Sequence, residues 1–85
     1  MRNRIYLIGS QDCLDFCNAA NERGERVDLV DGTGRYRINA KSIMGCLMAS
    51  REWGDEVYIE SEADLYDYFH EWIADTADDA ANIHE

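Results

Sequence analysis

The 85-residue sequence lacks the hallmarks of several protein classes, and these absences narrow its function before any motif is considered. It has no apolar run approaching the ~18 residues that cross a membrane, and no segment typical of a secretory leader. Proline, internal repeats and linker-like stretches are absent as well. A chain of this length can bury only one core. We therefore expect a single cytosolic domain over residues 1–75, followed by a tail over 76–85 that is at most a frayed helix.

Basic residues are scarce and confined to one part of the chain. All eight lie at or before Arg51, together with six acidic residues, whereas residues 52–85 contain twelve acidic residues and no Lys or Arg. The net charge of −10 repels a phosphate backbone, which argues against nucleic acid as a partner. Because the two halves should interleave in the fold, the sequence predicts an acidic face beside a mildly basic one. A merely soluble acidic surface is the alternative.

Cysteine and histidine are too few and too scattered for a disulfide framework or a zinc site. Cys13 and Cys17 share the apolar face of an expected helix, so we expect packed, reduced thiols there. Redox or metal chemistry is the alternative for these thiols. His70 falls off the apolar face of its helix, which predicts a solvated side chain, and His84 lies in the tail. No metal or cofactor is expected.

Hydrophobic periodicity predicts four strands and three helices in the order βαββαβα. We expect strands over 4–9, 27–30, 36–38 and 56–60, with the tight turn Asp31–Gly34 joining the second strand to the third. The first helix should begin at Ser10 as N-cap, and its apolar stripe comprises Cys13, Phe16, Cys17 and Ala20. The second should begin at Ser42 and end near Gly54, which suits a left-handed position.

The third helix should follow Ser61–Asp64, a segment similar to a capping box. Its apolar face would comprise Leu65, Tyr68, Phe69, Trp72 and Ile73. These elements predict an α+β fold, a four-stranded antiparallel sheet with three helices on one face. An open second face explains the polar alternation of Asp28, Arg35 and Arg37.

The segment Ile38–Gly45 (INAKSIMG) resembles the stretch of the HPr family that carries a regulatory serine, in HPr itself and in the Crh regulators of catabolite repression. The resemblance implies the HPr-like open-faced β-sandwich, whose element order and length also fit. It further implies a role in the bacterial sugar phosphotransferase system. On this basis Ser42 is the candidate site of regulatory phosphorylation.

The phosphocarrier motif of the same family, Gly-x-His-Ala-Arg-Pro at the start of the first helix, is missing. Here the chain reads Gly9-Ser10-Gln11-Asp12-Cys13, without histidine, arginine or proline. Ser10 and Gln11 therefore mark a degenerate phosphocarrier position, because a phosphohistidine needs an imidazole nitrogen. We predict no catalytic residue and no enzymatic activity.

Ser42 has two compatible interpretations, since an N-cap hydroxyl and a phosphoserine both meet the N–H groups at a helix start. The residues around it, Lys41, Ile43, Met44 and Leu47, are the candidate partner-binding surface that the resemblance implies. Met48 is expected to point into the core, with Ile43 and Leu47 at least partly outward.

The leading hypothesis is thus a non-catalytic HPr-like module that binds a protein partner under the control of Ser42. The partner would be HPr kinase, or a transcriptional regulator if the chain is Crh-like. The alternative is a diverged domain of the same fold that acts as a scaffold or binds a small regulatory molecule.

Overall fold

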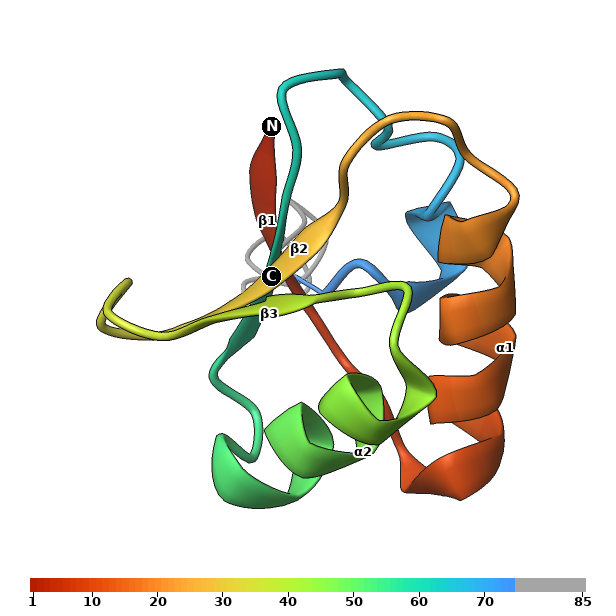
Figure 1. Ribbon diagram of the computed structural model, residues 1–85. Coiled ribbons are helices and arrows are strands. Elements are labelled where there is room, and N and C mark those ends of the chain that lie inside the picture. Colours follow the sequence, from red (N-terminus) through yellow and green to blue (C-terminus); the bar gives the residue numbers. More distant parts are fainter. Residues whose placement is uncertain (75–85) are drawn as a thin grey trace, which may run out of the picture.

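The computed structural model describes residues 1–74, so the predicted tail over 76–85 and His84 lie outside the described residues. Within this part the chain forms an α+β domain with a four-stranded antiparallel sheet and two α-helices (Figure 1). The elements are β1 (Arg2–Ile5), α1 (Gly9–Asn21), β2 (Asp28–Asp31), β3 (Arg37–Asn39), α2 (Ile43–Glu52), β4 (Val57–Glu60) and the 3₁₀ helix η1 (His70–Trp72). No helix of residues 1–74 is long and apolar enough to cross a bilayer.

The strands lie in the order β1-β4-β2-β3, and every neighbouring pair is antiparallel. The register aligns Asn3, Ile59, Leu29 and Ile38 in one row across the sheet. The adjacent row contains Arg2, Glu60 and Asp28. Because side chains alternate between faces along a strand, the first row faces the core and the second faces away from it. The sheet therefore has one apolar face and one charged face.

The first strand lies earlier in the chain than the sequence predicts. It ends at Ile5, which pairs with Val57, and Val57 is the first residue of β4. Tyr6 N–H donates to the Trp72 carbonyl instead of continuing the ladder with β4. The expected strand over residues 4–9 is therefore wrong beyond Ile5, because the neighbouring strand offers no further partner.

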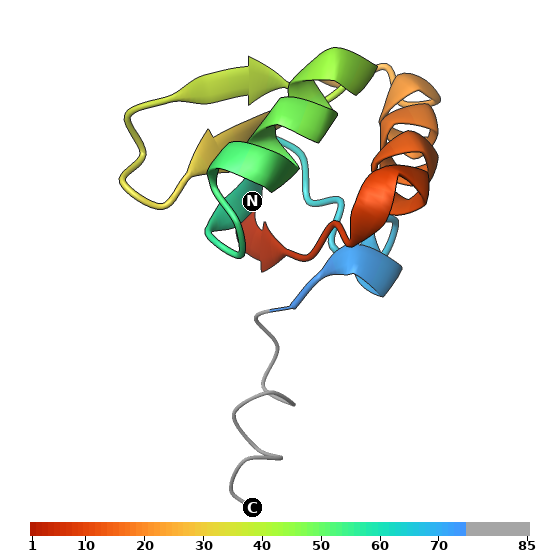
Figure 2. The ribbon, with the colours of Figure 1, turned by 90° about the horizontal axis from the view of Figure 1, so that it is seen from below.

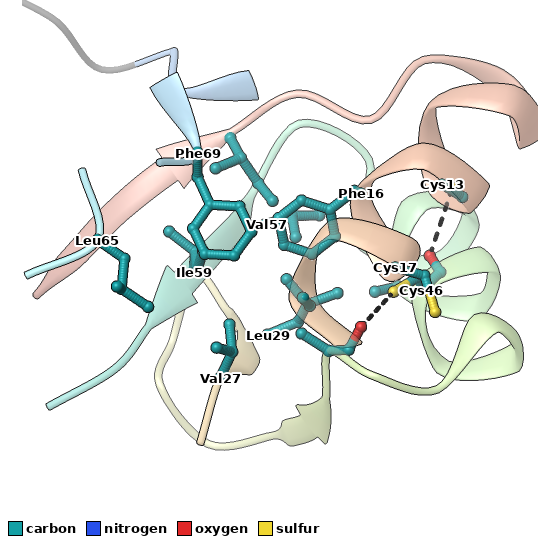
Figure 3. Packing of buried hydrophobic residues seen from close by; sticks show 14 residues of the cluster. Cys13, Phe16, Cys17, Val27, Leu29, Cys46, Val57, Ile59, Leu65 and Phe69 are labelled. Atoms are coloured by element: carbon teal, nitrogen blue, oxygen red, sulfur yellow. Dashed lines mark hydrogen bonds between the residues drawn. The ribbon is translucent and has the colours of Figure 1, made fainter. Parts of the chain in front are cut away.

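The hydrophobic core lies between the apolar face of the sheet and the two helices (Figure 3). Phe16 of α1 and Phe69 pack together with their ring centroids 5.2 Å apart, over Leu29, Val57 and Ile59 of the sheet. The predicted stripe of α1 is confirmed, since all four of its residues are buried. In Figure 2 the β2–β3 hairpin projects away from both helices.

The starts and ends of the helices follow local hydrogen bonding. Ser10 is not the N-cap of α1, because the helix begins at Gly9 and Ile8 occupies the cap position. The Asp12 carboxylate accepts a hydrogen bond from Ile8 N–H (2.9 Å) and so satisfies a donor at this end. The left-handed position predicted for Gly54 is confirmed, with φ of +60°, directly after the cap residue Trp53 of α2.

The predicted third α-helix is not found among the described residues. The stretch from Leu65 forms a single α-type turn (Phe69 N–H to Leu65 C=O, 3.0 Å) and then the 3₁₀ helix η1. The expected capping box is also wrong, because Ser61 and Asp64 each accept a hydrogen bond from the N–H two residues later. The chain must become extended by Ile73, which pairs with Ile5 of β1, and this leaves no length for a second helical turn.

Candidate functional site: an apolar patch across two helices

The orientation of α2 determines which of its side chains reach solvent. Cys46 and Ala49 face the core, and both are fully buried. Gly45 lies against Ile38 of β3, so closely that a Cβ there would overlap the Ile38 side chain. Small residues thus occupy the inner face of α2 and let the helix approach the sheet. The expectation that Met48 points inward is wrong: it is about half exposed (49%).

Ser42 is the N-cap of α2, as predicted. Its hydroxyl oxygen accepts a hydrogen bond from Gly45 N–H at 3.1 Å, and the residue itself is exposed. Lys41 beside it is half-buried, and its ammonium donates to the Arg23 carbonyl at 2.7 Å. The Ser42 hydroxyl is therefore within reach of solvent, whereas the neighbouring positive charge is directed toward the C-terminal end of α1.

Exposed apolar side chains gather along the contact between α1 and α2. A shallow hollow of about 210 Å³ opens between the helices, lined by Ser10, Gln11, Leu14, Ile43 and Leu47. Ile43 and Leu47 are half-buried and pack against the core from the other side. We call the whole surface the helical patch and define it as Ile8, Leu14, Ile43, Met44, Leu47 and Met48.

The degenerate phosphocarrier position borders this patch. Ser10 and Gln11 are both exposed at the start of α1, and the Gln11 amide donates to the Asp15 carboxylate at 2.9 Å. His70 is exposed, as predicted, but it belongs to η1. That segment packs along α1, where the neighbouring Tyr68 hydroxyl donates to the Ala19 carbonyl (2.8 Å). His70 thus lies on a different segment from the degenerate phosphocarrier position at the start of α1.

The three cysteines lie together at the contact between α1 and α2 (Figure 3). All are buried and free, as predicted for Cys13 and Cys17. Each thiol points to a backbone carbonyl, with Cys46 donating to Ala40 C=O at 3.2 Å and Cys17 to Lys41 C=O at 3.3 Å. Burial, with a smaller contribution from the other two thiols, raises the pKa of Cys46 to about 12. Cys46 is therefore protonated and unreactive at neutral pH, because the thiolate is the reactive form of cysteine.

Sequence reasoning identified only part of the patch. Ile43, Met44 and Leu47 were predicted, whereas Ile8, Leu14 and Met48 were not. Leu14 carried a usable signal, because it falls outside the apolar stripe of α1 and so had to face away from the core. Ile8 was assigned to a strand that ends before it.

Among residues 1–74 no group of three or more His, Cys, Asp or Glu side chains is arranged to hold a metal ion. A scan against models of known protein families finds no match, and a search of the curated proteins finds no significant match. The likeness to the HPr family therefore depends on the segment Ile38–Gly45 and on the order of the elements.

Proposed function

We propose that this chain is a non-catalytic protein-interaction module of the HPr type, in which the helical patch docks on a partner protein and Ser42 is the control site. Its fold would then be the HPr-like sandwich, and its place of action the cytosol of a bacterium. The observation that carries the proposal is the exposure of apolar surface beside that serine, since Met44, two residues further along the chain, is 72% exposed. Exposed apolar surface of this kind is typical of protein-binding sites.

The composition of the patch suits a protein partner. Met44 and Met48 are flexible and polarisable, which lets a surface adapt to a partner's shape. The hollow between α1 and α2 has room for one apolar side chain of that partner. Gln11 and Ser10 at its edge offer hydrogen bonds but no imidazole, so they support a binding role rather than phosphate transfer.

Phosphorylation of Ser42 would place about two negative charges beside Ile43 and Leu47. The phosphate would meet the free N–H groups at the start of α2, so the fold itself should tolerate it. An apolar partner would lose affinity, whereas a partner that offers Arg or Lys would gain it. Ser42 would thus select between partners rather than switch folding on or off.

The binding test uses Met44→Asp, because this side chain is mostly exposed and the fold should keep its stability within about 0.5 kcal/mol. Catabolite control protein A, a transcriptional regulator, is the partner that the resemblance to the HPr family implies. We expect the affinity for it, measured by calorimetry, to fall about tenfold or more. Tyr36→Asp, an exposed position on the β2–β3 hairpin, is the matched control and should bind normally. Equal loss in both variants would refute docking through the helical patch. Leu47→Asp is a poorer probe because Leu47 also packs against the core.

The modification test compares Ser42→Asn with the unaltered chain. Asparagine is an equally good N-cap, so this variant keeps the start of α2 and removes only the acceptor hydroxyl. Incubated with HPr kinase and ATP, the unaltered chain should gain one phosphate on Ser42 by mass spectrometry, and Ser42→Asn should gain none. Phosphate on another residue, or none on the unaltered chain, would remove Ser42 from the proposal.

A further inference from the structure

The outer face of the sheet holds most of the positive charge of an acidic protein. Neither α1 nor α2 covers this face, since both pack on the opposite side. Five of the eight basic residues of the chain lie on it or in its hairpin: Arg2, Arg4, Arg26, Arg35 and Arg37. All five are arginines, whose planar guanidinium matches a carboxylate through two parallel hydrogen bonds.

A charge network holds three of these arginines in place. The Asp28 side chain is only 6% exposed and bonds both Arg26 (3.0 Å) and Arg37 (2.8 Å). Arg37 also bonds Glu60, and Arg2 lies 3.6 Å from the same carboxylate. Arg26 is nevertheless 79% exposed, so most of its donors face solvent. The guanidinium groups are therefore ordered before any ligand arrives, which lowers the entropic cost of binding.

The remaining two arginines, Arg4 and Arg35, differ from these three. In the part of the chain that the structure describes, neither Arg4 nor Arg35 forms an ion pair. The Arg4 guanidinium lies over the Tyr6 ring, 5.2 Å from its centroid. Asp28 and Glu60 pair with Arg2, Arg26 and Arg37, and Glu25 and Glu62 border the same face. Five arginines thus stand beside four carboxylates on a chain whose net charge is −10, and Arg4 and Arg35 are the cations left for a ligand.

Shape and aromatic content add to this charge. A broad, open hollow of about 1000 Å³ lies at one end of the face, and the charged side chains that line it are Arg2, Arg26, Arg37, Glu25, Asp28, Glu60 and Glu62. Tyr36 is 62% exposed on the hairpin, which projects freely in both ribbon views. Exposed Tyr and Arg together are the residues most enriched where proteins bind one another.

We propose that this outer sheet face binds an acidic polypeptide segment of a partner protein, whose Asp and Glu carboxylates pair with Arg4, Arg35 and the exposed donors of Arg26. A nucleic acid fits less well, because its evenly spaced phosphates would also meet Glu60 and Glu62, which border the arginines. A polypeptide can place its carboxylates unevenly and avoid them. The face lies opposite the helical patch, so the domain can bind two partners at once.

The experiment measures binding of a fluorescein-labelled decaglutamate peptide to the full chain by fluorescence anisotropy. We expect binding at low ionic strength that weakens at roughly 0.15 M salt, where exposed charges are screened beyond about 8 Å. Arg35→Glu should lower the affinity about tenfold. The matched control is Arg51→Glu, an exposed residue of α2 on the other side, which makes the same change in net charge and should alter affinity less than about twofold.

Arg4→Glu should reproduce the loss, and circular dichroism will show whether each variant keeps its fold. Should Arg4→Glu unfold the chain, Arg35→Glu alone decides, because Arg35 is exposed. Equal losses from Arg35→Glu and Arg51→Glu would overturn the proposal, as would the absence of decaglutamate binding at low salt. Tighter binding of a deca-thymidylate strand would assign the face to nucleic acid instead. Self-association that Arg35→Glu abolishes, seen by sedimentation, would assign it to a second copy of the chain.

Discussion

The pKa of the Cys46 thiol lies well above the usual value for cysteine. Its thiol is fully buried and donates to the Ala40 carbonyl, and burial raises its pKa to about 12. In the unfolded chain a cysteine titrates near 8.5. Between these two values the native state keeps the proton that the unfolded state has lost. This side chain therefore contributes stability that is complete below about pH 8.5 and disappears as the pH rises toward 12.

We predict that the free energy of unfolding, measured with urea between pH 8 and pH 10.5, falls as the pH rises. Cys46→Ala should show a shallower fall, although it will be less stable at pH 8 because it leaves a small cavity. Iodoacetamide in native buffer should leave Cys13, Cys17 and Cys46 unlabelled, and urea should expose all three. Rapid native labelling, or identical pH slopes in the two proteins, would mean that the thiols are not held in the core.

The packing of α2 on the sheet depends on Gly45, which has no side chain. A Cβ on Gly45 would overlap Cγ2 of Ile38, because α2 packs directly on β3 there. Alanine would gain about 1 kcal/mol of helix propensity at this position. The overlap should cost more, since inserting a methyl group into a packed contact typically costs about 1–3 kcal/mol. Packing is thus expected to outweigh propensity.

Gly45→Ala should lower the free energy of unfolding by roughly 1 kcal/mol, measured by urea denaturation. The control is Gly24→Ala, because a Cβ on Gly24 meets no atom within 4 Å and its φ is not in the left-handed region. The free energy of unfolding of that variant should equal that of the unaltered chain or exceed it slightly. A stabilising Gly45→Ala would show that α2 can move away from the sheet at little cost.

At the scale of the whole molecule, two electrostatic effects oppose each other. The net charge of −10 favours expansion of the chain, whereas the ion pairs around Asp28, Glu60 and Glu25 favour the folded state. All five pairs have a partner whose side chain is more than a third exposed, and exposed pairs contribute about 0.2–1 kcal/mol each at most. Self-repulsion should therefore dominate at neutral pH.

We predict that the unfolding midpoint in thermal scans at pH 7 rises when sodium chloride is increased from low ionic strength to roughly 0.3 M, because salt screens the repulsion between surface carboxylates. Sodium sulfate should be avoided, since sulfate strengthens apolar burial by a separate mechanism. The same scan on Arg51→Glu, which is more acidic, should show a larger rise. A midpoint that falls with salt would mean that the ion pairs of the outer sheet face outweigh the net charge.

The sequence by itself determined the features that depend on residues close to one another in the chain. The stripe of α1, the Ser42 cap and the left-handed Gly54 each depend on a few neighbouring residues, so periodicity and capping chemistry were enough to predict them. Partial exposure of Ile43 and Leu47 also followed from the helical period, whereas Met44 was implied by the resemblance to the HPr family. The Ser42 hydroxyl at the start of α2 and part of the helical patch could therefore be predicted from the sequence alone.

Tertiary structure decided the strand and helix ends and the exposed faces that the sequence did not predict, because each depends on a contact with a residue that is distant in the sequence. β1 ends at Ile5 only because β4 begins at its partner Val57, and the segment before Ile73 forms no long helix because Ile73 must reach β1. Met48 faces solvent because Gly45 and Ala49 bring α2 close to the sheet. The arginine face exists only once the strand order places Arg2, Glu60 and Asp28 in one row, and strand order depends on how the whole chain buries its apolar surface.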